Sequence, residues 1–163
     1  MAKAPKLILR YEGVFDFQEI YDYIVNFFKD KHYDYLETGW KEKDASPQGR
    51  ERTVKMKPEK NITEYLKHKY KLEWKSVDAH NVAVEQDGKS KQHTHARLHI
   101  HIEAELAEDW QGLGKKHEKL KGFFDKHVFK REKENVYMEA LEKEMQALLD
   151  GIKQQLGMQT TKY

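Results

Sequence analysis

The sequence predicts a single α+β domain over residues 1–157, in which a curved antiparallel β-sheet wraps around a long C-terminal helix. Three observations lead to this fold class. Strand-like alternation of apolar and polar residues fills the middle of the chain, helical periodicity appears towards both ends, and the apolar residues of each segment share one face. A sheet with one apolar face needs a cover, and the C-terminal helix is expected to supply it. Residues 158–163 are expected to form a frayed tail.

The N-terminal elements are a strand and a helix. Residues 6–15 alternate, with Leu7, Leu9, Tyr11 and Phe15 on one parity, as in a strand that buries one face. Asp16 then suits a helix N-cap, and Glu19 completes a pattern that resembles a capping box. The apolar residues that follow at helical spacing are Phe17, Ile20, Tyr21, Ile24, Phe27 and Phe28.

The middle of the chain reads as a succession of strands. They are predicted around Leu36–Trp40, Arg52–Met56 and Leu66–Lys75, with a turn at Asp44–Gly49 and a short strand at Val82–Val84. The pair Asp87-Gly88 predicts a hairpin. The apolar face of the long returning strand consists of Ala96, Leu98, Ile100, Ile102, Ala104 and Leu106.

The C-terminal part returns to helical spacing. A helical segment is predicted over the apolar positions Leu120, Phe123, Phe124, His127 and Val128. From Glu134 an amphipathic helix that ends at Gly157 is predicted by the stripe Val136, Leu141, Met145, Leu148, Leu149, Ile152 and Leu156.

Composition excludes several classes of protein. Charged residues make up 36% of the 163 residues, but aromatic residues reach 12%, which argues against a disordered chain. No apolar run is long enough to cross a membrane, so membrane insertion is not expected. The absence of cysteine excludes disulfides and thiolate chemistry. A net charge of +2 argues against a dedicated DNA-binding protein, and the N-terminus lacks a secretory core, which predicts a cytoplasmic location.

The order of strand, helix, antiparallel strands and long C-terminal helix resembles the START-like, helix-grip superfamily, which includes polyketide-cyclase-like and lipid-transfer proteins. The resemblance spans nearly the whole chain and consists of element order, without a short diagnostic motif. It implies a helix-grip-like fold with a ligand cavity between the sheet and the C-terminal helix.

The inner face of the predicted sheet offers candidate ligand-binding residues: His68, Tyr70, Trp74, Trp40, Leu98 and Ile100. A mostly apolar surface with a few oriented polar groups is the usual composition of a small-molecule site. The alternative is that the same aromatic residues simply fill the core, with each polar tip hydrogen bonded.

The opposite face carries a run of histidines. Alternate residues of a strand share a face, so His95, His99, His101 and Glu103 could together hold a divalent metal such as zinc. Two alternatives stand beside this: a solvated face that titrates near neutral pH, and a pH-sensitive interface between copies of the chain. Lys67, Lys69, Lys71 and Lys75 also face outward, but aromatic platforms for bases are missing there, so nucleic-acid binding is not expected.

No catalytic motif is present, and no catalytic residue is assigned. The sequence therefore predicts non-enzymatic binding of a hydrophobic or amphipathic small molecule, such as a lipid, between the sheet and the C-terminal helix. The alternative function is an interaction or metal-binding protein that uses the outer His/Lys-rich face to bind a metal, a partner or a second copy of itself.

Overall fold

A computed structural model describes residues 2–34, 37–46, 49–63, 66–86, 88–108 and 136–157. The elements in chain order are β1 (Ala2–Lys3), β2 (Leu7–Phe15), α1 (Phe17–Asp30), β3 (Glu37–Ser46), β4 (Gly49–Met56), β5 (Glu59–Asn61), β6 (Leu66–Gln86), β7 (Lys89–Glu108) and α5 (Met138–Gln155). The α+β class with an antiparallel sheet is confirmed. The helix predicted over Leu120–Val128 and the tail of residues 158–163 lie outside the described residues.

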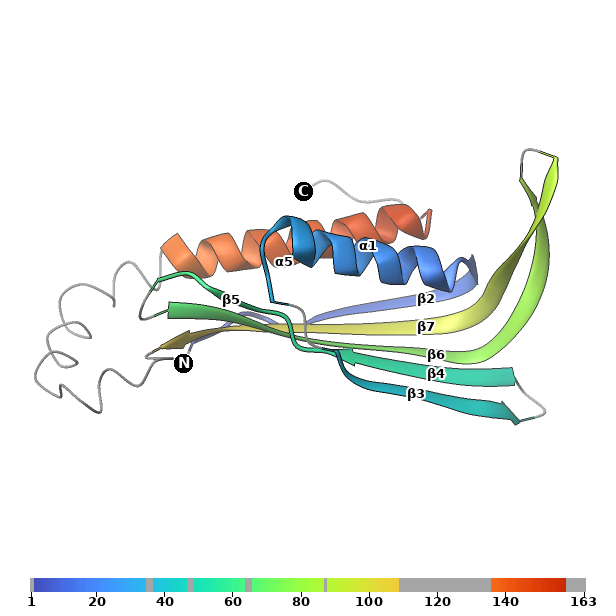
Figure 1. The fold of residues 1–163 in the computed structure, drawn as a ribbon, viewed down its shortest axis with the longest axis horizontal. Helices are drawn as coiled ribbons and strands as arrows, with labels where there is room; N and C mark the ends of the chain where they lie inside the picture. Colours follow the sequence, from blue (N-terminus) through green and yellow to red (C-terminus); the bar gives the residue numbers. More distant parts are fainter. Residues whose placement is uncertain are drawn as a thin grey trace, which may run out of the picture.

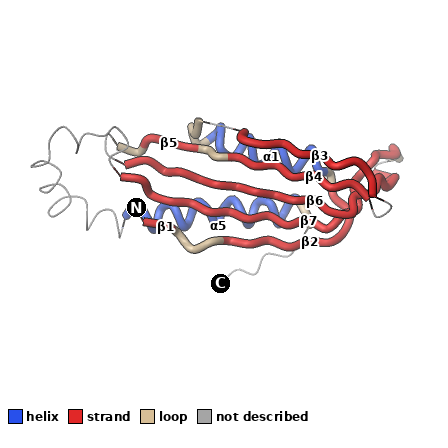
Figure 2. The backbone as a smooth tube through the Cα atoms, turned by 90° about the horizontal axis from the view of Figure 1, so that it is seen from below, coloured by secondary structure: helices blue, strands red, loops and turns tan. Residues whose placement is uncertain are grey.

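The strands form one antiparallel sheet in the order β1-β7-β6-β4-β3, with β2 also paired to β7 and β5 also paired to β6. β2 and β3 lie at opposite edges of this sheet, which is open rather than closed (Figure 2). Both helices cover the same face, which we call the inner face, and the outer face carries no described helix (Figure 1).

The long hairpin of β6 and β7 bends away from the plane of the other strands at its far end (Figure 1). The register of this pair shifts between Val77 and His80, and Asp78 has a positive φ of 57°, as in a β-bulge. Gly49 makes room for this bend, because a Cβ there would lie 2.7 Å from the Asp78 carbonyl carbon.

The strand ends predicted in two places are wrong, because the strands in the structure are longer than the sequence indicates. The segments Leu66–Lys75 and Val82–Val84 are not separate strands, because the bulge lets β6 continue its pairing with β7 up to Gln86. The predicted turn at Asp44–Gly49 is shorter, since β3 continues to Ser46 and β4 begins at Gly49. Interstrand hydrogen bonding therefore extends the strands beyond the residues that alternate most clearly.

The two helices begin and pack as their sequences require. The Asp16 side chain accepts hydrogen bonds from the backbone N–H groups of Gln18 and Glu19, which confirms it as the N-cap of α1. α5 ends at Gln155, two residues before the predicted end at Gly157, and Gly157 follows the C-cap with the positive φ of 70° that favours glycine. Gly151 of α5 lets the helices approach closely, because a Cβ there would clash with the Tyr23 hydroxyl of α1.

One continuous hydrophobic core lies between the inner face and the helices. All the predicted inner positions of β7, from Ala96 to Leu106, are buried. They pack with the stripes of α1 and α5, whose buried residues include Ile24, Phe28, Leu141, Met145 and Leu148. The alternation of apolar and charged residues therefore produces a thin, two-layer protein with one interior.

Candidate functional site

The inner face contains a polar cluster between the sheet and α5, which we call the tyrosine cluster and define as Tyr33, His68, Tyr70 and Glu144. His68 and Tyr70 lie on β6, two residues apart, so both point inward. Tyr33 follows α1, where His32 with its positive φ of 63° turns the chain back towards the sheet. Glu144 reaches the cluster from α5.

One carboxylate oxygen organises this cluster. Tyr33 Oη donates to Glu144 Oε1 at 2.5 Å, and Tyr70 Oη donates to the same oxygen at 2.8 Å. Tyr33 Oη also lies 3.0 Å from His68 Nδ1. Because the hydroxyl proton of Tyr33 is directed to Glu144, His68 donates its Nδ1–H to Tyr33, which leaves a lone pair on Nε2.

Burial sets the charge state of the cluster. Burial, followed by the neighbouring Glu144 carboxylate, raises the pKa of both Tyr33 and Tyr70 far above the usual tyrosine value, so both remain hydrogen-bond donors. Burial also lowers the pKa of His68, a shift that the charge of Glu144 opposes and that of Lys60 reinforces. The cluster therefore presents a neutral imidazole with an accepting nitrogen rather than a cation.

This lowered pKa predicts a pH-dependent stability. As pH falls through the ordinary histidine pKa of 6.5, His68 takes up a proton in the unfolded chain before it does so in the folded protein. The free energy of unfolding should therefore decrease between about pH 7.5 and 5.5. His68→Phe should flatten this dependence in urea-unfolding experiments. Tyr70→Phe, which removes no group that titrates in this range, should retain the wild-type slope; equal slopes for wild type and His68→Phe would contradict the assignment.

Three of the buried side-chain atoms that have no hydrogen-bond partner among the described residues lie on the inner side of β6: His68 Nε2, Trp74 Nε1 and Ser76 Oγ. All three side chains are at least nine-tenths buried. An unsatisfied buried polar atom costs about 1–3 kcal/mol, so a group of three on one strand requires an explanation.

Trp74 and Ser76 have well-defined surroundings. The Trp74 ring makes edge-to-face contacts with Phe17 and Tyr21 of α1, with ring centroids 5.6 and 5.8 Å apart. Ser76 pairs with Leu98 on one side and with Arg52 of β4 on the other. The guanidinium of Arg52 lies 5.1 Å from the centre of the Phe17 ring, which brings a cation to this end of the inner face.

The structure brings most of the predicted ligand-binding residues to one face. His68, Tyr70, Trp74, Leu98 and Ile100 all point inward and are buried. Trp74 lies beside Ile100 in the register of β6 and β7, whereas His68 and Tyr70 lie towards the other end. Trp40 pairs with Val54 at the backbone, and its side chain lies outside the described residues. Their role in binding a ligand stays a prediction.

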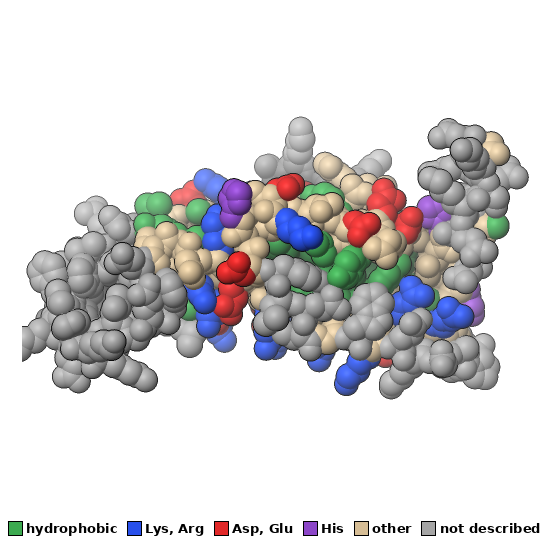
Figure 3. Space-filling view, viewed as in Figure 1, with side chains coloured by type: hydrophobic (Ala, Val, Ile, Leu, Met, Phe, Trp, Pro, Cys, Tyr) green, Lys and Arg blue, Asp and Glu red, His purple; other side chains and the backbone are tan. Residues whose placement is uncertain are grey.

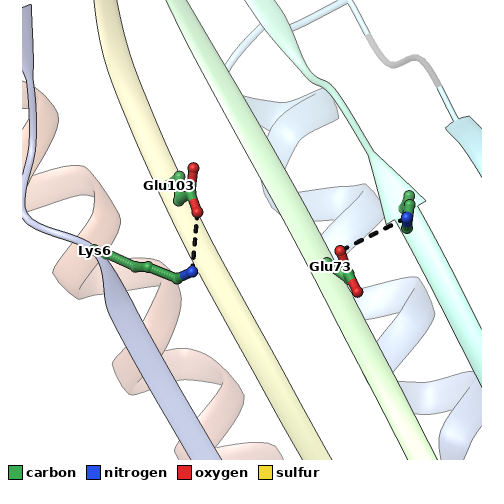
Figure 4. Close-up of polar contacts among 4 residues, drawn as sticks. Lys6, Glu73 and Glu103 are labelled. Carbon is green, nitrogen blue, oxygen red and sulfur yellow. Dashed lines mark ion pairs between the residues drawn. The ribbon is translucent and has the colours of Figure 1, made fainter.

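The predicted metal residues lie on the outer face of β7. His99 is flanked by Arg10 and Lys75, and burial together with these cations and Arg97 lowers its pKa. Glu103 of β7 forms an ion pair with Lys6 at 3.1 Å. On the neighbouring strand β6, Glu73 forms a similar pair with Lys55 of β4 at 3.9 Å (Figure 4). Among the residues that the structure describes, no three His, Asp or Glu side chains converge closely enough to hold a metal ion. The zinc site stays a prediction.

The outer face is charged and shallowly hollowed. Lysine and arginine side chains project along the underside of the sheet in the space-filling view (Figure 3). One depression of about 470 Å³ is bordered by Lys3, Lys6, Lys57, Lys69 and Lys71, with three glutamates among them. A second depression, of about 300 Å³, is bordered by His99, His101 and Lys75.

Sequence reasoning missed Tyr33 and Glu144. Glu144 lies three residues after Leu141 and four before Leu148, so this carboxylate interrupts the apolar stripe of α5. A charged residue at such a position indicates a buried polar partner, and this signal could have identified it. Tyr33 lies in a connection without periodicity, and its contact with Glu144 joins residues 111 positions apart.

The fold and the inner face define a two-layer α+β protein with a buried, hydrogen-bonding strand. No protein-family model matches the sequence, and no curated protein is significantly similar to it. No helix among the described residues is long and apolar enough to span a membrane.

Proposed function

We propose that the protein binds an elongated amphipathic molecule, such as a long-chain carboxylic acid, between the inner face of the sheet and the helices α1 and α5. The observation that carries this proposal is a row of polar atoms on β6, at His68, Trp74 and Ser76, that have no hydrogen-bond partner within the described part of the chain. A ligand with polar groups at matching positions would satisfy atoms that no described residue of the protein hydrogen-bonds.

The spacing of these atoms favours an elongated ligand. His68 and Trp74 are six residues apart on one strand, which corresponds to about 20 Å. The inward side chains between them are Tyr70, whose hydroxyl is already bonded to Glu144, and Leu72. A chain lying along this strip would contact apolar surface in the middle and reach a polar group at each end.

The two ends differ in chemistry. Trp74 Nε1–H and Ser76 Oγ–H are donors, and the Arg52 cation lies next to them, so this end suits a carboxylate. His68 Nε2 is an acceptor, so the other end suits a hydroxyl group. An ω-hydroxy fatty acid would satisfy both ends.

Binding in this place requires the layers to separate. Trp74, Leu98 and Ile100 are each at most 1% exposed, so the helices cover the strip closely when no ligand is bound. The helix-grip arrangement, with the sheet curved around α5, belongs to the same proposal, and the order of strand, helix, antiparallel strands and helix supports it. By mass action, a ligand bound between the layers would raise the stability of the folded state.

Ser76→Ala tests the proposal because it should change binding and stability in opposite directions. Removing an unsatisfied hydroxyl should leave the free energy of unfolding unchanged or raise it slightly. The same change should weaken the binding of palmitate by about threefold to tenfold, as measured by displacement of a dansyl-labelled fatty acid. Palmitate methyl ester, whose carbonyl is an uncharged and weaker acceptor, should lose less affinity than palmitate does on this substitution.

Thr53→Ala is the matched control. Thr53 lies on the neighbouring strand β4 opposite Lys75, so this substitution removes a hydroxyl from the outer face rather than the inner face. It should leave palmitate affinity unchanged. Failure of palmitate to bind the wild-type protein, or equal affinities for wild type and Ser76→Ala, would contradict the proposal.

A second candidate function uses the outer face. It is favoured by the two depressions there and by the surplus of lysine around the larger one. Such a surface suits an acidic partner. This second candidate also includes the zinc site proposed for the neighbouring histidines. Native mass spectrometry with and without chelator, on the wild type and on the double variant His99→Ala/His101→Ala, distinguishes it from the inner-face proposal.

A further inference from the structure

The two edges of the sheet differ in regularity. β3, at one edge, shifts register twice against β4, and such bulges discourage further strand pairing. β2, at the other edge, pairs with β7 over nine consecutive residues without any shift. Among the described residues, no strand pairs with the free side of β2 (Figure 2). Within the described residues, β2 is therefore an edge without register shifts, and its outward backbone groups can pair with another strand.

The outer side of β2 also carries exposed apolar residues. Ile8 is 49% exposed and Val14 is 40% exposed, and they account for two of the three large apolar side chains that are exposed in the described part of the chain. Between them lie Arg10 and Glu12, which are exposed and form no ion pair with another described residue. The outer-face side chains of β2 are therefore, in chain order, apolar, positive, negative and apolar.

This pattern is complementary to itself. If two copies of β2 pair antiparallel about a two-fold axis at Tyr11, residue 8 of one copy lies opposite residue 14 of the other, and residue 10 lies opposite residue 12. Ile8 then meets Val14, and Arg10 meets Glu12, each pair occurring twice. Opposed residues in such a pair share one face of the sheet, with Cβ atoms about 4.5–5.5 Å apart.

We infer that β2 is a homodimer interface, at which two copies of the chain join their sheets edge to edge through antiparallel β2 strands. The occupant is a second copy because, in the antiparallel register centred on Tyr11, both the charges and the apolar residues of β2 are complementary to those of its own copy. This inference does not depend on the ligand between the layers, since β2 contributes its outer side and the backbone edge that no described strand pairs with.

Charge reversal at the edge tests this interface. Arg10→Glu places like charges opposite each other at two symmetric positions, and Glu12→Arg does the same with the opposite sign. Each variant alone should dimerise at least about tenfold more weakly than wild type in sedimentation-velocity experiments over two decades of concentration. An equimolar mixture of the two variants should recover the dimer, because every opposed pair is then attractive. The double variant Arg10→Glu/Glu12→Arg should recover it as well.

Lys41→Glu, on the bulged edge strand β3, is the control and should leave association unchanged. Circular dichroism verifies that all variants are folded. A wild-type protein that stays monomeric over the whole range would overturn the inference. So would a dimer that Arg10→Glu leaves intact, because association would then use another surface, such as the histidine face.

Discussion

Glu144→Ala is expected to lower the free energy of unfolding by about 2–4 kcal/mol. The substitution removes the one oxygen that accepts both tyrosine hydroxyls of the tyrosine cluster, and it leaves Tyr33 and Tyr70 as buried donors without their acceptor. Burial prevents these hydroxyls from ionising, so loss of a proton cannot relieve them. Urea unfolding followed by far-ultraviolet circular dichroism measures the loss.

Two further variants separate the hydrogen bonds from general effects on α5. Glu144→Gln keeps an accepting oxygen and should cost about 1 kcal/mol. Glu142→Ala removes an exposed carboxylate from the same helix and should change stability by less than about 0.5 kcal/mol. Equal losses for Glu144→Ala and Glu142→Ala would show that the cluster contributes nothing.

Trp74→Ala should cost about 3–5 kcal/mol of unfolding free energy, the largest effect of any single substitution proposed for this protein. Trp74 is 1% exposed and connects the middle of β6 to α1 through Phe17 and Tyr21. Removing the indole leaves a cavity between the layers, where the surrounding side chains can relax only partly.

Trp74→Phe distinguishes the packing of this side chain from its hydrogen-bonding role. It keeps an aromatic ring against α1 and should cost clearly less stability than Trp74→Ala. It also removes the Nε1–H, which no described residue accepts, so it should weaken palmitate binding even in a well-folded protein. If Trp74→Phe binds palmitate as tightly as wild type, the indole donor has no part in ligand recognition.

The sequence predicts those parts of the fold that depend on local periodicity. The apolar parity of β7 and the cap and stripe of α1 are each determined by neighbouring residues, and the structure confirms them. The bend of β6 could not be predicted in this way. Its bulge places a non-glycine residue, Asp78, at a positive φ, and it depends on close approach to Gly49 of another strand.

The same distinction applies to the candidate site. The inward parity of His68, Tyr70 and Trp74 follows from strand alternation, so these residues were identified from the sequence. Their partners were not, because Tyr33 and Glu144 reach the cluster from a connection and from a helix distant in the chain. That His68 Nε2 and Ser76 Oγ find no hydrogen-bond partner among the described residues is likewise a property of packing, which no pattern along a single strand encodes.

The inner-face site and the dimer edge use different surfaces of the same sheet. The proposed ligand contacts residues on the inner face of β6 and β7, whereas the proposed dimer uses the outer side and free edge of β2. We therefore expect Arg10→Glu to leave palmitate affinity unchanged and Ser76→Ala to leave association unchanged. Independent behaviour of these two variants would establish that the surfaces act separately.

The most direct measurement of the central claim locates a bound chain relative to the two faces of the sheet. Leu98 and Ile100 supply methyl groups on the inner face, and Ile8 and Val14 supply them on the outer face. Nuclear Overhauser contacts between ¹³C-labelled palmitate and these methyl groups therefore report which face the chain occupies. We predict contacts with Leu98 and Ile100 and none with Ile8 and Val14. Contacts with the outer methyl groups alone, or no contacts at saturating palmitate, would contradict a ligand site between the layers.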